Sequence, residues 1–122
     1  MKRTKAQPRF DLDLKFGQES ENEFLKAIEG KVECKSDRLC IKTGNVYIET
    51  ESRGKVSGIY NTDAKHYALC LYKPDREEQV WVVIPTNHLR KLMVKYPIKA
   101  GGVNWTSKGH IIPKEDLLTF NI

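Results

Sequence analysis

Three carboxylates, Asp37, Glu49 and Glu51, are candidates for one cluster, and they lie in two short segments whose alternating apolar and polar residues are typical of half-buried strands. The segments are Val32–Asp37 and Val46–Glu51. Because side chains alternate between the two faces of a strand, Glu49 and Glu51 should share one face, and Asp37 should lie on the polar face of the first segment. Carboxylates that converge on one point repel one another unless a cation neutralises them. An all-oxygen cluster suits a hard divalent ion, above all Mg²⁺, with Mn²⁺ as its substitute.

The spacing of the two segments predicts how these acids meet. If the intervening residues fold back symmetrically, the segments form a hairpin centred near Thr43, and Asp37 lies roughly across from Glu49. Lys35 shares a face with Asp37, so an ammonium group would stand beside the cluster. The alternative is a solvent-facing strand edge on which Glu49 and Glu51 pair with Lys35 across the hairpin.

A fourth acid precedes the two segments. Gly17–Gly30 predicts a helix with an apolar stripe made of Phe24, Leu25 and Ile28. Glu21 falls on the same stripe, and a carboxylate on a buried helix face is unfavourable unless something pairs with it. Glu21 is therefore a candidate member of the cluster, and a glutamate at the helix rim that reaches water is the alternative.

The remaining elements predict an α/β sandwich on a mixed sheet. Tyr67–Tyr72 and Gln79–Ile84 are nearly continuous apolar runs, which favours strands at the centre of the sheet. Asn87–Tyr96 has helical spacing and ends before a proline. His110–Ile112 should be a short last strand at an edge, because Pro113 cannot donate to a neighbour.

Length, charge and cysteine usage narrow the class of protein. The chain has 122 residues, a net charge of +5 and three cysteines. This length favours a single domain over residues 10–122, preceded by a basic flexible arm over residues 1–9. The cysteines are odd in number and lack C-x-x-C spacing, which favours a reducing, cytoplasmic setting over a disulfide framework or a zinc site. The longest apolar run, Val80–Ile84, is too short to cross a membrane, so no membrane association is expected.

The order of the acids resembles that of the PD-(D/E)xK nuclease superfamily, and the resemblance covers about residues 17–96. Gly17–Phe24 is similar to the G-x-x-x-E-x-x-apolar helix of members that resemble Holliday-junction resolvases. Asp37 takes the place of the first Asp of the motif, and Glu49–Glu51 stands where (D/E)-x-K is expected. Thr43–Glu49 looks like the corresponding stretch of small phage-encoded members.

The resemblance implies a three-layer restriction-endonuclease-like core, a mixed central β-sheet flanked by helices, and a Mg²⁺-dependent DNA endonuclease, structure-selective in the manner of the resolvases. Asp37, Glu49 and Glu21 would hold the metal. Glu51 would act as a base or hold a second ion, and Lys35 would stabilise the developing negative charge. A nuclease with one small domain often needs two active sites to cut both strands of a duplex, so the resemblance is also compatible with a homodimer. The residues expected to grip the DNA backbone are Arg38, Lys42, Arg53 and Lys55.

One departure from the family pattern opens alternatives. The usual lysine of the motif is replaced by Glu51, as in active E-x-E members of the superfamily. A second registration uses Glu33–Lys35 as the E-x-K motif, with Asp11 or Asp13 as the partner acid. A catalytically inactive nucleic-acid-binding module on the same fold is the rival function. A third candidate is a phage protein that contacts a host protein.

Overall fold

The computed structural model describes residues 7–37, 40–71 and 79–119. It divides the chain into two compact units, residues 1–30 and 31–122. Of the arm expected at residues 1–9, Gln7 to Arg9 belong to a helix, and residues 1–6 lie outside the described residues.

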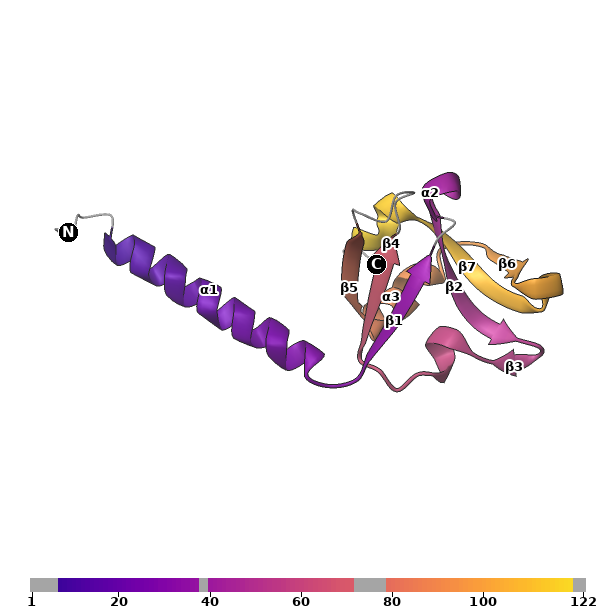
Figure 1. Cartoon of the computed structure of the whole chain (residues 1–122), viewed down its shortest axis with the longest axis horizontal. Coiled ribbons are helices and arrows are strands. Elements are labelled where there is room, and N and C mark those ends of the chain that lie inside the picture. Colours follow the sequence, from indigo (N-terminus) through magenta and orange to yellow (C-terminus); the bar gives the residue numbers. More distant parts are fainter. Residues whose placement is uncertain (1–6, 38–39, 72–78, 120–122) are drawn as a thin grey trace. The chain divides into compact units, whose positions relative to one another are not determined.

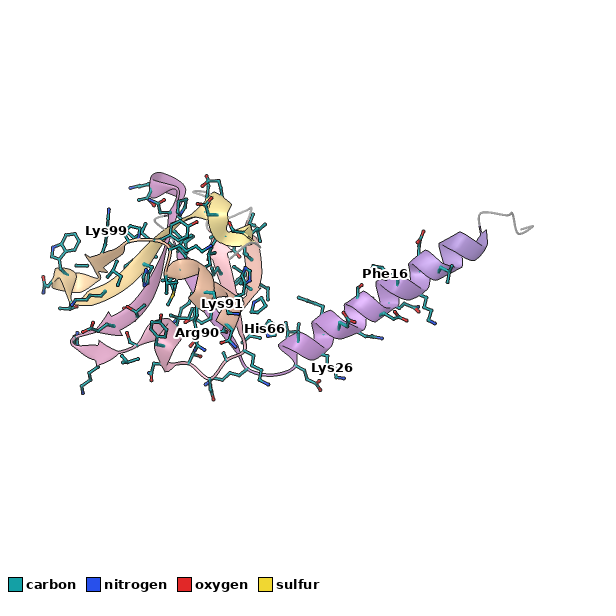
Figure 2. All side chains as sticks on the ribbon, turned by 180° about the vertical axis from the view of Figure 1, so that it is seen from behind. Phe16, Lys26, His66, Arg90, Lys91 and Lys99 are labelled. Atoms are coloured by element: carbon teal, nitrogen blue, oxygen red, sulfur yellow. The ribbon has the colours of Figure 1, made fainter. Side chains whose placement is uncertain are left out.

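The first unit contains one helix, α1 (Gln7–Ile28), which is longer than the sequence predicted. Gly17 lies inside the helix instead of at its start, and its neighbours are mostly helix-forming Glu, Gln, Leu and Lys residues. Phe16 extends away from the helix axis, and both it and Phe24 are exposed (Figure 2). Glu21 is exposed as well. The expected buried stripe is therefore uncovered within this unit.

The second unit is built on two sheets (Figure 1). The first sheet has three strands in the order β1-β4-β5, and it is mixed because β1 runs parallel to β4 while β5 runs antiparallel to it. The middle strand, β4, is buried along its centre, whereas the edge strand β5 exposes most of its side chains. These strands are β1 (Val32–Asp37), β4 (His66–Leu71) and β5 (Val80–Pro85).

The second sheet is antiparallel throughout, in the order β3-β2-β7-β6. Its hairpin turn, Arg53–Gly54, has positive φ values of 52° and 77°, as a two-residue type I′ turn requires. Glycine adopts this left-handed backbone easily because it has no Cβ, which suits Gly54 to the second position of the turn. The strands are β2 (Asn45–Ser52), β3 (Lys55–Val56), β6 (Ile98–Gly101) and β7 (Ser107–Pro113).

Short helices connect and cover the two sheets. Arg90 on the longest of them donates hydrogen bonds to the carbonyl oxygens of Ile59 and Thr62, so its guanidinium ties this helix to the segment that connects β3 and β4 (Figure 2). The helices are α2 (Cys40–Thr43), η1 (Gly58–Asn61), α3 (Thr86–Met93), η2 (Val103–Trp105) and η3 (Lys114–Leu118).

The hydrophobic core lies between the sheets and α3. Val46 and Ile48 point into it, as strand alternation predicted. Leu89 and Met93 of α3 are completely buried at i and i+4, the spacing that places two side chains on one helix face. Tyr67 belongs to this core as well, and it also lines the pocket of the candidate site.

Three expectations about topology are wrong. Val32–Asp37 and Val46–Glu51 do not form a hairpin, because β1 and β2 belong to different sheets and α2 separates them. The strand at Gln79–Ile84 lies at an edge rather than at the centre, and the strand ending at Pro113 lies between β2 and β6 rather than at an edge. Pro113 is tolerated because it is the last residue of β7. The α/β class with a mixed sheet is confirmed.

No helix of the described segments combines the length and the apolar character needed to cross a membrane.

Candidate active site

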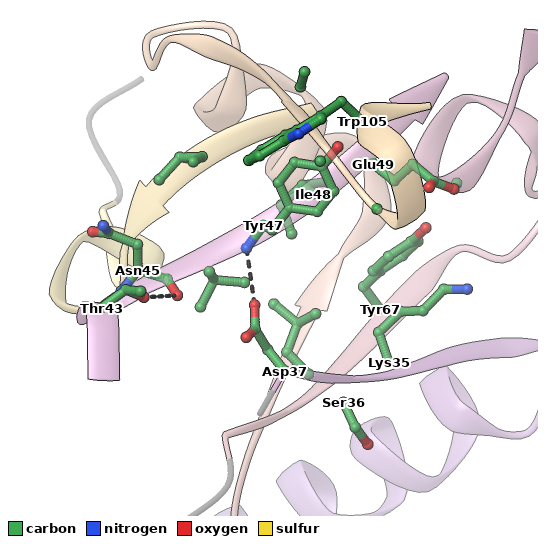
Figure 3. A pocket seen from close by; sticks show the side chains of 17 residues that line it. Lys35, Ser36, Asp37, Thr43, Asn45, Tyr47, Ile48, Glu49, Tyr67 and Trp105 are labelled. Carbon is green, nitrogen blue, oxygen red and sulfur yellow. Dashed lines mark hydrogen bonds between the residues drawn. The ribbon is translucent and has the colours of Figure 1, made fainter. Parts of the chain in front are cut away.

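A pocket of about 700 Å³ lies between β1 and β4 on one side and β2 with the β6–η2 segment on the other. Lys35 and Asp37 of β1 line it, together with Tyr47 and Glu49 of β2 and Tyr67 of β4 (Figure 3). The pocket therefore brings together three of the charged residues that the sequence singled out, from strands that do not pair with each other.

The register of β1 against β4 explains which charged groups face this pocket. Glu33 is paired with Tyr67, and Lys35 is paired with Leu69. Residues directly paired across neighbouring strands point to the same side of the sheet. Because Tyr67 and Leu69 belong to the core, Glu33 and Lys35 lie on the core side of β1, where Lys35 lines the pocket and Glu33 is half-buried outside the pocket lining.

Asp37 is held by backbone donors. Its Oδ1 accepts a hydrogen bond of 3.0 Å from the backbone N–H of Cys40, and its Oδ2 accepts one of 3.0 Å from the backbone N–H of Tyr47. The first bond satisfies a free donor at the start of α2, and the second ties β1 to the start of β2. Both carboxylate oxygens thus have structural partners.

Glu49 is positioned by the segment that follows the β2–β3 hairpin. Its Oε2 accepts a hydrogen bond of 2.9 Å from the hydroxyl of Ser57. Gly58 packs directly on the Glu49 backbone, and a Cβ at this position would collide with the Glu49 carbonyl oxygen. The Glu49 carboxylate is half-buried and its orientation is set by these neighbours.

Glu51 is separated from Glu49 by a β-bulge. In the pairing of β2 with β7, Glu49 lies opposite Gly109, but Glu51 lies opposite Lys108, so Thr50 is the extra residue. Consecutive residues of β7 point to opposite faces, and therefore Glu49 and Glu51 do as well. The Glu51 carboxylate lies 4.0 Å from the Lys108 ammonium instead of in the pocket. The expectation that the two glutamates share a face is wrong for this reason.

Tyr67 connects the two sides of the site electrostatically. The pKa of its phenol is raised to about 12, chiefly by burial; the negative charges of Glu33 and Glu49 contribute to this increase, and the positive charge of Arg90 opposes it. Glu33 and Glu49 come from different sheets, yet their charges act on one hydroxyl group. Lys35 and Tyr67 extend toward the side of the pocket where the Glu49 carboxylate lies (Figure 3).

The other residues selected from the sequence lie elsewhere. Glu21 belongs to the first unit, where its side chain is exposed. Lys42 lies on α2 before β2, and Arg53 and Lys55 lie after it, so a strand of eight residues, roughly 26 Å long, separates the first cation from the other two. All three side chains are exposed. Arg38 falls outside the described residues.

Glu49 lines the pocket and Glu33 is paired with Tyr67, and these two carboxylates could hold a divalent ion. Within residues 7–37, 40–71 and 79–119, no three His, Cys, Asp or Glu side chains gather in a ready-made metal cage. Mg²⁺, however, is usually bound through one or two carboxylates and completes its shell with water and substrate oxygens. Glu33 and Glu49 supply this kind of donor set, with Lys35 nearby.

Two residues of the candidate site, Tyr67 and Ser57, were not selected by sequence reasoning. Tyr67 opens an apolar run that predicted a strand at the centre of the sheet, and Ser57 has no candidate base beside it in the sequence. A signal for Tyr67 did exist, because a tyrosine beside a charged strand can present its hydroxyl to that charge. The contact of Ser57 with Glu49 depends on the β2–β3 hairpin and could not be read from spacing.

No family model matches the chain, and no significant similarity to a curated protein or to a solved structure was found.

Proposed function

We propose that this protein is a metal-dependent nuclease that hydrolyses phosphodiester bonds with the side chains of Glu33, Lys35 and Glu49. The observation that carries the proposal is the pocket that brings Lys35 of one sheet together with Glu49 of the other, beside Tyr67, which is paired with Glu33 of β1. This favours the registration in which Glu33–Lys35 is the E-x-K motif, and it gives the missing motif lysine a place on β1. The restriction-endonuclease-like core and DNA as substrate are parts of the same proposal.

Each residue of the group would have a separate task. A bound Mg²⁺ would lower the pKa of a coordinated water and neutralise charge on the phosphate. Glu33 and Glu49 would hold the ion, and Ser57 keeps Glu49 in one orientation. The Lys35 ammonium would stabilise negative charge that develops on the phosphate oxygens. Tyr67 stays protonated at neutral pH because its pKa is about 12, so its hydroxyl can donate a hydrogen bond.

The other acids have different parts in this proposal. Asp37 shapes the pocket by fixing the ends of β1 and β2, as its two backbone hydrogen bonds indicate. Glu51 lies on the opposite face of the bulged strand and would not touch the reacting group. The exposed cations Lys42, Arg53 and Lys55 would bind the flanking phosphates.

The test is cleavage of labelled single-stranded, duplex and branched DNA with Mg²⁺ or with a chelator. The parent protein should cut at least one of these substrates only with the metal, and Glu33→Gln should abolish the cutting. Glu115→Gln, a change to an exposed glutamate of η3, is the matched control and should cut like the parent. Metal-independent cutting, or equal cutting by Glu33→Gln, would refute the proposal.

One observation favours a second candidate, a nucleic-acid-binding module without catalysis. A third acid that joins Glu33 and Glu49 in one cluster is not found within the described residues. This candidate predicts salt-sensitive DNA binding and no hydrolysis of any of the three substrates with Mg²⁺ or Mn²⁺. The same cleavage experiment therefore separates the two functions.

A further inference from the structure

An exposed tryptophan is held beside the pocket by an unusual backbone. Trp105 of η2 lines the pocket, and 75% of its surface is accessible to solvent. Asn104 and Trp105 have φ values of 55° and 58°, which lie in the left-handed region that residues other than glycine rarely adopt. A strained segment that presents a large aromatic ring to solvent indicates a role for that ring outside folding.

A second aromatic ring at the same rim is fixed in place. The Tyr47 ring packs against two glycines, since a Cβ added at Gly109 or Gly101 would lie only 2.7 Å or 2.9 Å from its Cζ. The Tyr47 hydroxyl forms a hydrogen bond of 2.5 Å with the hydroxyl of Ser107, which is buried. Trp105 and Tyr47 both line the pocket, and Figure 3 draws their rings at the part of it away from Lys35. The two aromatic residues form a platform, defined here as Tyr47 and Trp105.

The space beside this platform has the size and chemistry of a small-molecule site. Its volume of about 700 Å³ falls within the range of about 300–1,000 Å³ that is typical of such sites. Its aromatic platform suits a flat ring, whereas Lys35 and Glu49 suit a phosphate group with its metal. Lys99 is exposed and lies on the same face as Glu49, because both residues pair with Gly109. A nucleotide has both of these parts joined in one molecule.

We propose that the platform of Tyr47 and Trp105 receives an unpaired nucleobase of the strand that lies at the Lys35–Glu49 end of the pocket. This inference rests on the proposed function and adds the substrate class. A base inside an intact duplex is stacked on both sides and is not free to enter a pocket. An aromatic side chain stacks on any base with little sequence preference. The preferred substrate is therefore single-stranded nucleic acid or a strand with unpaired nucleotides, rather than continuous duplex.

The test is equilibrium binding in the presence of a chelator, so that no bond is cut. The probes are a single-stranded 12-mer DNA, the same strand with one abasic site at each successive position, and the 12-base-pair duplex. Trp105→Ala should weaken binding of the single strand about tenfold and binding of the duplex less than twofold. Trp105→Phe should restore most of the affinity, because it keeps a ring that can stack.

Trp81→Phe is the matched control, since Trp81 is also exposed but lies on β5 outside the pocket lining. This variant should bind like the parent. Equal binding of the single strand by Trp105→Ala and the parent would overturn the inference, and so would equal losses on single strand and duplex. If the parent binds as expected but never cuts with Mg²⁺, the proposed function fails and the inference stands. If the parent cuts and Trp105→Ala binds and cuts equally well, the inference fails alone.

Discussion

The carboxylate of Asp37 accepts a hydrogen bond of 3.0 Å from the backbone N–H of Tyr47. This bond joins the last residue of β1 to the first half of β2, and the two strands belong to different sheets. Removing an acceptor leaves a backbone donor without its partner in a half-buried position, which costs about 1–3 kcal/mol. Asp37→Ala should therefore lower the free energy of unfolding by about 2 kcal/mol.

Asp37→Asn is the matched variant, because it keeps one carbonyl acceptor and should lose about half as much stability. Denaturant unfolding followed by circular dichroism measures both changes. If Asp37→Ala unfolds at the same denaturant concentration as the parent, the structural role assigned to this carboxylate is wrong.

Gly58 supports the backbone of Glu49 and cannot carry a side chain. Its φ is +59°, and a Cβ would meet the Glu49 carbonyl. Gly58→Ala should lower the free energy of unfolding by at least about 2 kcal/mol, from backbone strain together with the collision. Gly54 also has a positive φ, of +77°, but open space around it, so Gly54→Ala should lower stability by only about 1 kcal/mol. Thermal unfolding of the two variants isolates the collision, and equal losses would contradict it.

The buried phenol of Tyr67 predicts a loss of stability in strong base. Its pKa is about 12 in the folded protein, above the usual value of about 10 in an unfolded chain. Between these values the unfolded chain releases the proton while the folded protein keeps it, so stability falls as the pH rises from about 10 to about 12. The contribution of one such group approaches about 1.4 kcal/mol per pH unit.

Tyr67→Phe should remove this contribution, and the exposed Tyr60→Phe should not. The difference between parent and variant unfolding free energies, measured at several pH values between 9 and 12, gives the result. A pH-independent difference between the parent and Tyr67→Phe would mean that the phenol is accessible to solvent.

Whether a sequence can predict a structural relationship depends on how far apart in the chain the residues involved lie. Alternation along a strand is a local property, and it correctly placed Val46 and Ile48 in the core. The pairing of strands is not local. The sequence predicted that β1 and β2 pair with each other, but the short helix α2 turns the chain into a second sheet. A turn of four residues made of Cys, Ile, Lys and Thr carries little signal for such a change.

The bulge between Glu49 and Glu51 shows why the site was predicted only in part. Nothing in the sequence of β2 itself specifies an extra residue, because the bulge is set by the register against β7, about 60 positions later in the chain. Lys35 and Glu49 were selected and share the pocket. Glu33 was selected only in the second registration, since its relation to Tyr67 depends on the parallel pairing of β1 with β4.

The exposed cations predict a graded dependence of DNA binding on salt. Arg53 lies in the turn of the β2–β3 hairpin, Lys55 begins β3, and both are accessible to solvent. If each contacts one phosphate, replacing either by alanine should reduce the slope of log K against log salt concentration by about 1. Lys31 is a suitable control because it is paired with Asp63 at 2.7 Å. Unchanged slopes for both variants would place the nucleic acid on another surface.

The most direct test of the proposed site at Glu49 compares two glutamates that are only two positions apart in the sequence. Replacing a group that merely supports a metal ligand lowers activity about 10–100-fold, so Glu49→Gln should lower the metal-dependent cleavage rate by at least about 100-fold. Glu51→Gln should stay within about threefold of the parent, because an exposed ion pair such as that of Glu51 with Lys108 contributes little. Equal losses in the two variants, or a greater loss for Glu51→Gln, would contradict the bulged strand and the pocket built on it.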